Sequence, residues 1–163
     1  MDEPSDEELI ALFRKEGSRH YAFSLLVRKH QRRLYAFIRR MITDPDETKD
    51  VLQNVFIKAW TGLDKFRAEA QLFSWLYRIA HNESISHLKR MRRGLFVSDA
   101  GVVERLTTTL DSSEHFSGDA IERTLQRAVM KLPHKQRAVF TMKYFDGLKY
   151  EEMSRVTGTS VGA

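Results

Sequence analysis

Residues 50–60 read Asp50-Val51-Leu52-Gln53-Asn54-Val55-Phe56-Ile57-Lys58-Ala59-Trp60, and this stretch decides the fold class. Its apolar residues recur at steps of three and four, which is typical of a wide apolar stripe along one face of a helix. The stripe comprises Val51, Leu52, Val55, Phe56, Ala59, Trp60 and Leu63. We therefore predict a core helix here, with Phe56 and Trp60 buried.

The opposite face of this helix carries Gln53, Asn54, Ile57 and Lys58. An apolar Ile57 beside two amides, where water is expected, indicates a contact surface, although single exposed apolar residues are common. We predict that Gln53 and Asn54 are exposed to solvent. From spacing alone, an ordinary core helix with a solvated outer face is the alternative.

Similar patterns predict helices along most of the chain, and therefore an all-α fold. Ser5 or Asp6 can cap a helix that begins near Glu7, and Asp44 followed by Pro45 can open the helix described above. Further helices are expected over residues 19–43, 71–91 and 119–132, from about 134 to 145, and over 150–156. Ser160 is the expected N-cap of one more helix.

The helical pattern dissolves between residues 95 and 118. From Asp99 to Glu122 there are six acidic residues and one Arg, with Ser and Thr clusters among them. We predict a flexible linker over 95–118 that joins a domain of residues 1–94 to a second of residues 119–163. The two domains are expected to touch modestly and not to share one core.

The amino-acid composition limits the kinds of function that this protein can have. The 163 residues are 42% hydrophobic, enough for a core, and the formal net charge of +5 suits a polyanionic partner; a merely basic protein is the alternative. The absence of cysteine excludes disulfides and thiolate metal sites and fits a reducing cytoplasm. No apolar run approaches the roughly 20 residues that span a bilayer. The acidic N-terminus is unlike a secretory signal peptide.

Enzymatic functions find little support in the sequence. The six His residues have no metal-ligand spacing, and no Gly-rich phosphate loop is present. Glu151 and Glu152 are adjacent, so they point in different directions on a helix and do not form an acid–base pair. We therefore expect no catalytic residues, no cofactor and no metal.

The motif Asp50-x-x-Gln53-x-x-Phe56-x-x-Ala59-Trp60, followed by Lys65-Phe66 and by residues 73–82, resembles region 2 of bacterial sigma factors, in the short form of the extracytoplasmic-function (ECF) group. The resemblance implies a face for the β′ clamp helices of core RNA polymerase, made by Asp50, Gln53, Asn54, Ile57 and Lys58. It implies a −10 promoter surface made by Lys65, Phe66, Arg67, Tyr77, Arg78, His81, Asn82, Lys89 and Arg90. Core packing is the alternative for Phe66, Trp75 and Tyr77.

Residues 150–161 read as a helix-turn-helix, with Gly158 at the turn. Together with Leu132-Pro133-x-x-x-Arg137 upstream, they resemble sigma region 4. The resemblance implies that Thr159 and Ser160 belong to the −35 reader. Only Ser160–Ala163 of its recognition helix are present, so a truncated region 4 and an incomplete −35 reader are expected.

The resemblance implies a promoter-specificity factor of the bacterial cytoplasm, which binds core polymerase at the β′ clamp and β flap, reads −10 and −35 elements and is held inactive by an anti-sigma factor. Two alternatives stay open. One is a helix-turn-helix repressor or activator that acts without core polymerase, and the other is a helical protein-interaction module.

Overall fold

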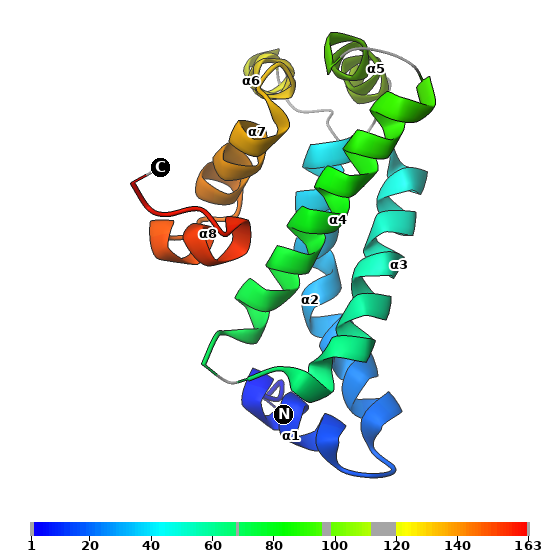
Figure 1. The fold of residues 1–163 in the computed structure, drawn as a ribbon, viewed down its shortest axis with the longest axis vertical. Coiled ribbons are helices and arrows are strands. Elements are labelled where there is room, and N and C mark those ends of the chain that lie inside the picture. The colour runs from blue at the N-terminus through cyan, green and yellow to red at the C-terminus, as the bar shows by residue number, and fades with distance from the viewer. Residues whose placement is uncertain (1, 68, 96–98, 112–119, 163) are drawn as a thin grey trace.

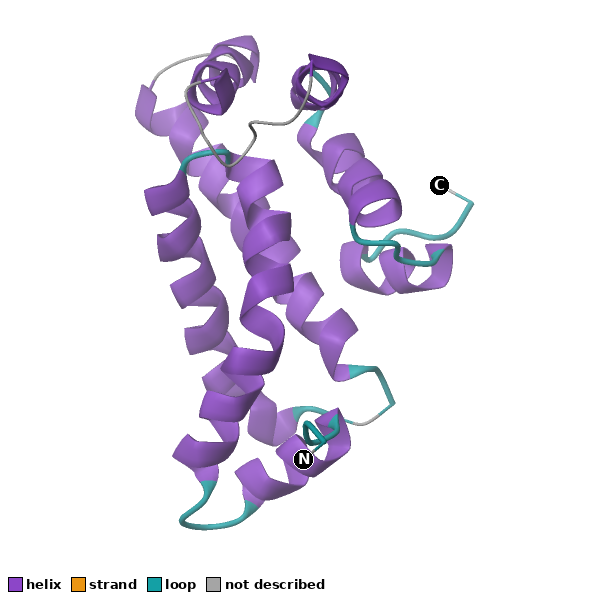
Figure 2. Cartoon of the chain, turned by 180° about the vertical axis from the view of Figure 1, so that it is seen from behind, coloured by secondary structure: helices purple, strands orange, loops and turns teal. Residues whose placement is uncertain are grey.

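The computed structural model describes residues 2–67, 69–95, 99–111 and 120–162, and within these ranges every regular element is helical (Figures 1 and 2). The N-terminal half contains α1 (Asp6–Arg14), α2 (Arg19–Ile42), α3 (Pro45–Gly62), the 3-10 turn η1 (Leu63–Lys65) and α4 (Leu72–Leu95). The remainder contains α5 (Asp99–Asp111), α6 (Ala120–Met130), α7 (His134–Phe140), the π-helical turn η3 (Thr141–Phe145) and α8 (Tyr150–Thr157). The prediction of an all-α fold is confirmed.

Helix starts follow the predicted caps. The Ser5 hydroxyl accepts from the Glu8 amide while the Glu8 carboxylate accepts from the Ser5 amide, which is a complete capping box. The Asp44 carboxylate accepts from the amides of Asp46 and Glu47 at 2.9 Å, and Pro45 fills the first position of α3. These local bonds satisfy amides that the helix itself leaves unpaired, and so they fix where α1 and α3 begin.

Helices α2, α3 and α4 lie side by side as a bundle, and α1 crosses its lower end (Figure 1). Fully buried Leu34, Phe37 and Val55 belong to the core of this bundle. At the α1 end, the ring of Phe13 meets the edge of Trp60 with centroids 5.2 Å apart. Burial of these apolar side chains is the main force that holds the bundle together.

A helix occupies most of the predicted linker. α5 has buried Val102 and Leu106, which are four residues apart and therefore lie on one face. The Thr43 hydroxyl donates to the Leu106 carbonyl at 3.0 Å, and Arg105 pairs with Glu47 at 3.2 Å, so α5 is fixed to the ends of α2 and α3. The acidic, Ser- and Thr-rich composition concealed this short apolar edge. The predicted linker positions 96–98 and 112–118 lie outside the described residues.

The C-terminal helices pack on the bundle through a shared core, which corrects the expectation of two separate cores. One continuous cluster of buried residues includes members of the bundle and members of α6–α8. The C-terminal members are Met130, Ala138, Met142, Leu148, Met153 and Val156. Helices α7 and α8 lie beside α4 in both views (Figures 1 and 2), and α8 contacts α4 directly. The outer side of α4 is therefore partly covered.

Candidate functional site

The outer face of α3 presents the predicted amides to solvent. Asp50, Gln53 and Asn54 are exposed, and Ile57 has 56% of its surface accessible, whereas the opposite stripe faces the core. Within that stripe, Val51, Val55, Ala59 and Leu63 are fully buried and Leu52, Phe56 and Trp60 are half-buried. The predicted division of this helix into a core-facing and an exposed face is confirmed, but Phe56 and Trp60, which were predicted to be buried, are only half-buried.

Lys58 occupies the same outer face but has a partner. Its ammonium forms an ion pair with Glu83 of α4, and the Glu83 side chain is nearly buried whereas that of Lys58 is largely exposed. A buried carboxylate needs a counter-charge, so this pair links α3 to α4 and neutralises much of the Lys58 charge. Asp50, Gln53, Asn54 and Ile57 therefore make up the freely presented part of the surface, which we call the α3 outer face.

The loop after α3 is fixed to the bundle through contacts of Phe66 with Trp75 and Arg14. Phe66 is buried, its ring lies 5.2 Å from that of Trp75, and its carbonyl accepts a hydrogen bond from Arg14. A Cβ added to Gly62 would lie 3.0 Å from Trp75, so glycine is needed for this close approach. The loop presents exposed Lys65 and Arg67.

An 810 Å³ cavity opens beside this loop. Its lining consists of Arg14, Asp64, Lys65, Phe66, Arg67 and Glu69. Three cations exceed the two carboxylates of this lining by one, which gives a phosphate group a modest electrostatic attraction. The ring of Phe66 forms part of the cavity wall, and most of its surface is packed against the bundle.

The predicted −10 residues of α4 lie at different depths. Arg78, Asn82, Lys89 and Arg90 are exposed. His81 is buried, its Nδ1 lies 3.2 Å from Asn82 Oδ1, and desolvation lowers the pKa of His81. This side of α4 therefore offers an amide and several cations, with a neutral imidazole supporting the amide.

Tyr77 is placed differently from the prediction, because its side chain is fully buried. Its ring lies 4.5 Å from Phe73 and 5.2 Å from Phe37. The four-residue step from Phe73 puts Tyr77 on the core side of α4, which the sequence already allowed as the packing alternative. In this arrangement Tyr77 does not reach DNA.

The surroundings of the Tyr77 hydroxyl contain residues that the sequence did not single out. The hydroxyl lies 3.4 Å from the Arg33 carbonyl and beside the carboxyl of Asp146. Burial raises the pKa of Asp146 to about 6, although Arg40 and Arg33 act in the opposite direction. The guanidinium of Arg40 also lies over the ring of Phe145, at 4.2 Å. No local sequence pattern predicts this cluster, because its members come from α2, α4 and the turn after η3.

The exposed side of α4 faces the C-terminal helices across a 780 Å³ cavity. His81 and Asn82 line it from α4, and Phe140 and Tyr150 line it from the opposite side. The predicted reading residues therefore lie next to the helix-turn-helix segment in this arrangement.

Thr159 and Ser160 are exposed and follow α8, which ends at Gly158 with a left-handed φ of 71°. The described residues after Ser160 form a turn, so the helix expected from this N-cap is not present there. A helix needs at least one turn of i to i−4 hydrogen bonds, and two described residues are too few to supply it.

Candidate sites for other chemistry are few in the part of the chain that the structure describes. Those residues contain no group of three or more His, Asp or Glu side chains arranged to hold a metal ion. None of the described helices combines the length and the apolar character that crossing a membrane requires.

Two family matches cover most of the chain. Residues 26–94 match sigma-70 region 2, and residues 122–163 match sigma-70 region 4. The first match contains α3, the loop and nearly all of α4, and the second contains most of α6 and all of α7 and α8. The two matches contain the motifs of residues 50–82 and 132–161 that carry the resemblance.

Relatives and solved structures agree with these matches. The chain is 32% identical to the RNA polymerase sigma-H factor of Pseudomonas aeruginosa, over 99% of this chain and 87% of that protein. It is 29% identical to the ECF RNA polymerase sigma-E factor of Escherichia coli K12, over 97% of this chain and 85% of that protein.

Two solved structures share the fold. The sigma factor RpoE in complex with the anti-sigma factor NepR from Bartonella quintana gives a TM-score of 0.64 at 22% identity, covering 86% of this chain and 85% of that one. The structure of CnrH in complex with the cytosolic domain of CnrY gives a TM-score of 0.65 at 24% identity, covering 96% of this chain and 85% of that one. With both regions present in order and relatives matched over most of their length, the chain belongs to the sigma-70 family, in its extracytoplasmic-function group.

Proposed function

We propose that this chain directs RNA polymerase to promoters: it binds the core enzyme through the α3 outer face and reads the −10 element through the loop after α3 and the exposed side of α4. The observation that carries the proposal is the exposure of Gln53, Asn54 and Ile57 on a helix whose opposite face is buried. Two amides flanking an exposed apolar side chain give hydrogen bonds and apolar contact on one surface, as protein interfaces require. The chain needs no catalysis of its own for this role.

Two kinds of DNA contact are proposed: phosphate contacts, which give affinity, and base contacts, which give sequence specificity. Lys89 and Arg90, with Arg92 and Arg93 after them, supply phosphate contacts, which are independent of sequence. Asn82 supplies a base contact, since an amide can donate and accept at a base edge. Lys65 and Arg67 hold the backbone beside the loop cavity, which receives a displaced base.

Regulation follows from the packing of α7 and α8 on α4. The reading side of α4 lies across a cavity from Phe140 and Tyr150, so promoter access requires these helices to move away. Two structures of the same fold were solved with anti-sigma factors bound. We propose that an anti-sigma factor holds this chain in a closed arrangement in the bacterial cytoplasm, and that Thr159 and Ser160 contribute to −35 contact once it is released.

The test is run-off transcription from a candidate promoter with purified core polymerase. Gln53→Ala combined with Asn54→Ala should weaken core binding roughly tenfold or more, because two interface hydrogen bonds are lost, while the melting temperature stays nearly unchanged. Gln31→Ala, which removes an exposed amide from α2, is the matched control and should leave core binding intact.

Three results would contradict the proposal. One is unchanged core affinity in the Gln53/Asn54 double variant, and another is a large loss of stability in that variant. The third is promoter-specific binding to duplex DNA that is unaffected by core polymerase, which would favour a repressor or activator.

A further inference from the structure

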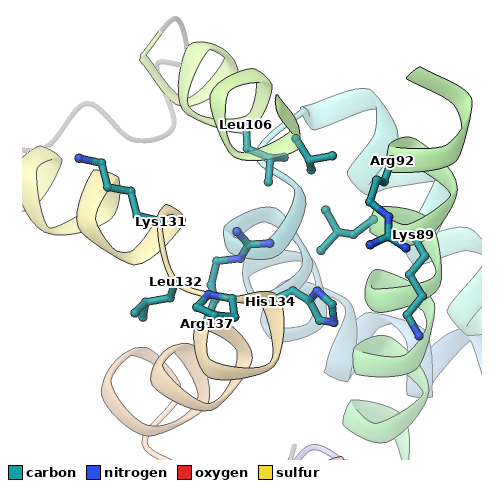
Figure 3. Close-up of a pocket in the computed structure, with 10 residues that line it drawn as sticks. Lys89, Arg92, Leu106, Lys131, Leu132, His134 and Arg137 are labelled. Carbon is teal, nitrogen blue, oxygen red and sulfur yellow. The ribbon is translucent and has the colours of Figure 1, made fainter. Parts of the chain in front are cut away.

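A second basic cavity lies where α4, α5 and the α6–α7 corner meet (Figure 3), and it has a volume of about 490 Å³. α4 and α5 contribute Leu88, Lys89, Arg92, Val102 and Leu106. The α6–α7 corner contributes Lys131, Leu132, Pro133, His134 and Arg137. None of these described lining residues is acidic, and four of them, Lys89, Arg92, Lys131 and Arg137, are cations.

Arg137 is the buried member of this set, with only 2% of its surface accessible. Its Nη1 donates to the Met130 carbonyl at 3.2 Å, while its Nε has no hydrogen-bond partner among the described residues. Figure 3 shows the guanidinium rising from α7 into the cavity, toward Leu106. A guanidinium buried without a full set of acceptors is costly, and an incoming anion would remove that cost.

The electrostatics agree with this geometry. Burial lowers the pKa of Arg137 to about 10, so the guanidinium still carries its charge at neutral pH. The exposed Lys89 and Lys131 stand on opposite sides of the cavity, and their flexible stems allow the ammonium groups to turn inward.

The rest of the wall is apolar. Leu88, Val102 and Leu106 are buried and come from α4 and α5. A volume of this size is within the range of about 300–1,000 Å³ that small-molecule sites occupy. Cationic groups on one side and aliphatic groups on the other fit a molecule with a phosphate at one end and a flat or apolar body.

We propose that this cavity binds a small phosphorylated molecule of the nucleotide class, with its phosphate on Arg137 and its body against Leu88, Val102 and Leu106. The lining comes from both sigma regions, so the ligand ties α4 and α5 to α7. Binding therefore stabilises the closed arrangement and opposes promoter reading. The site goes beyond the proposed sigma function, and its occupancy is measured without polymerase, so failure of one claim is distinguishable from failure of the other.

The direct test is calorimetric titration of the full chain at constant ionic strength with GDP, ADP, pyrophosphate, guanosine and a short single-stranded oligonucleotide. We expect a nucleoside diphosphate to bind best, pyrophosphate to bind more weakly and guanosine not to bind detectably up to about 1 mM. An oligonucleotide that binds more tightly than every diphosphate and loses that affinity in Val102→Phe would overturn the proposal in favour of a backbone-phosphate site in this cavity.

Substitutions in the cavity lining test whether the ligand binds there. Arg137→Gln should weaken diphosphate binding roughly tenfold or more, since a charge-assisted hydrogen bond is lost, and Arg137→Lys should restore part of it. Val102→Phe fills the cavity from α5 without touching a charge, and it keeps the test decisive if Arg137→Gln does not fold. Arg155→Gln removes an exposed cation from α8 and is the control.

Unchanged affinity in both folded Arg137→Gln and Val102→Phe would overturn the assignment, as would the absence of binding by every diphosphate. An equal loss in Arg155→Gln would do the same, because it would indicate attraction to net charge alone. A rise in melting temperature with GDP that Val102→Phe abolishes would support the site.

Discussion

Replacing Asp146 by Asn should stabilise the protein at alkaline pH and leave it unchanged in acid. The Asp146 carboxyl follows η3 and lies beside the Tyr77 hydroxyl of α4, while its Oδ2 has no hydrogen-bond partner among the described residues. Burial raises the pKa of Asp146 to about 6 from an ordinary value of 3.8. Asn removes the charge and keeps an oxygen that accepts from Tyr77.

The sign and size of the effect follow from this pKa. A carboxyl whose pKa is raised in the folded state contributes its full stability below pH 3.8 and loses it as the pH rises through about 6. The rise of about 2 in pKa corresponds to roughly 3 kcal/mol, which is an upper limit because Asp146 is partly accessible to solvent. Above pH 7 the Asp146→Asn variant should therefore be more stable than the parent chain by up to about 3 kcal/mol.

Urea unfolding followed by circular dichroism, at several pH values between acid and pH 8, measures this difference directly. Asp50→Asn removes an exposed carboxylate from α3 and should change stability by less than about 0.5 kcal/mol at every pH. If Asp146→Asn is less stable than the parent chain at pH 8, then attraction to Arg40 and Arg33 exceeds the cost of burial, and the reasoning is wrong.

Three further outcomes are expected. Phe13→Ala should lower the free energy of unfolding by about 3–5 kcal/mol in urea titrations, because a fully buried ring is removed from the α1 end of the core; a loss below 1 kcal/mol would contradict the packing. Arg92→Ala with Arg93→Ala should weaken holoenzyme binding to all promoters alike. The slope of the logarithm of the binding constant against the logarithm of the salt concentration should become shallower by roughly 1.5. Asn82→Ala should relax preference at one −10 position by about 1–3 kcal/mol in competition binding, and an unchanged preference would remove Asn82 from the reading surface.

Much of the fold was predictable because its determinants are local. The caps at Ser5 and Asp44 are hydrogen bonds between residues two or three positions apart, which a sequence displays directly. The spacing of apolar residues around Val55 likewise states which side of α3 is buried. The exposure of Gln53 and Asn54 followed from the same spacing.

The missed features depend on contacts between distant segments. α5 has only a short apolar edge, at Val102 and Leu106, and its place is fixed by bonds to Thr43 and Glu47 that no local pattern reveals. The family motif assigned Tyr77 to DNA, whereas helical spacing from Phe73 put it in the core.

A motif records which residue types occur at each position, but it does not state which way each side chain points. The shared core of α4 and α8 was also hidden, because each helix reads as an ordinary amphipathic element by itself.

The close packing of Trp75 against Gly62 and Phe66 gives the protein an intrinsic optical reporter. Its two tryptophans, Trp60 and Trp75, both belong to the bundle, so residues 120–162 are silent at tryptophan wavelengths. The indole of Trp75 packs against Phe66, whose ring and carbonyl hold the loop after α3 in place. If DNA enters beside this loop, as the proposed function requires, the emission of Trp75 should change on DNA binding, and a Trp60→Phe background leaves that signal unmixed, without any attached dye.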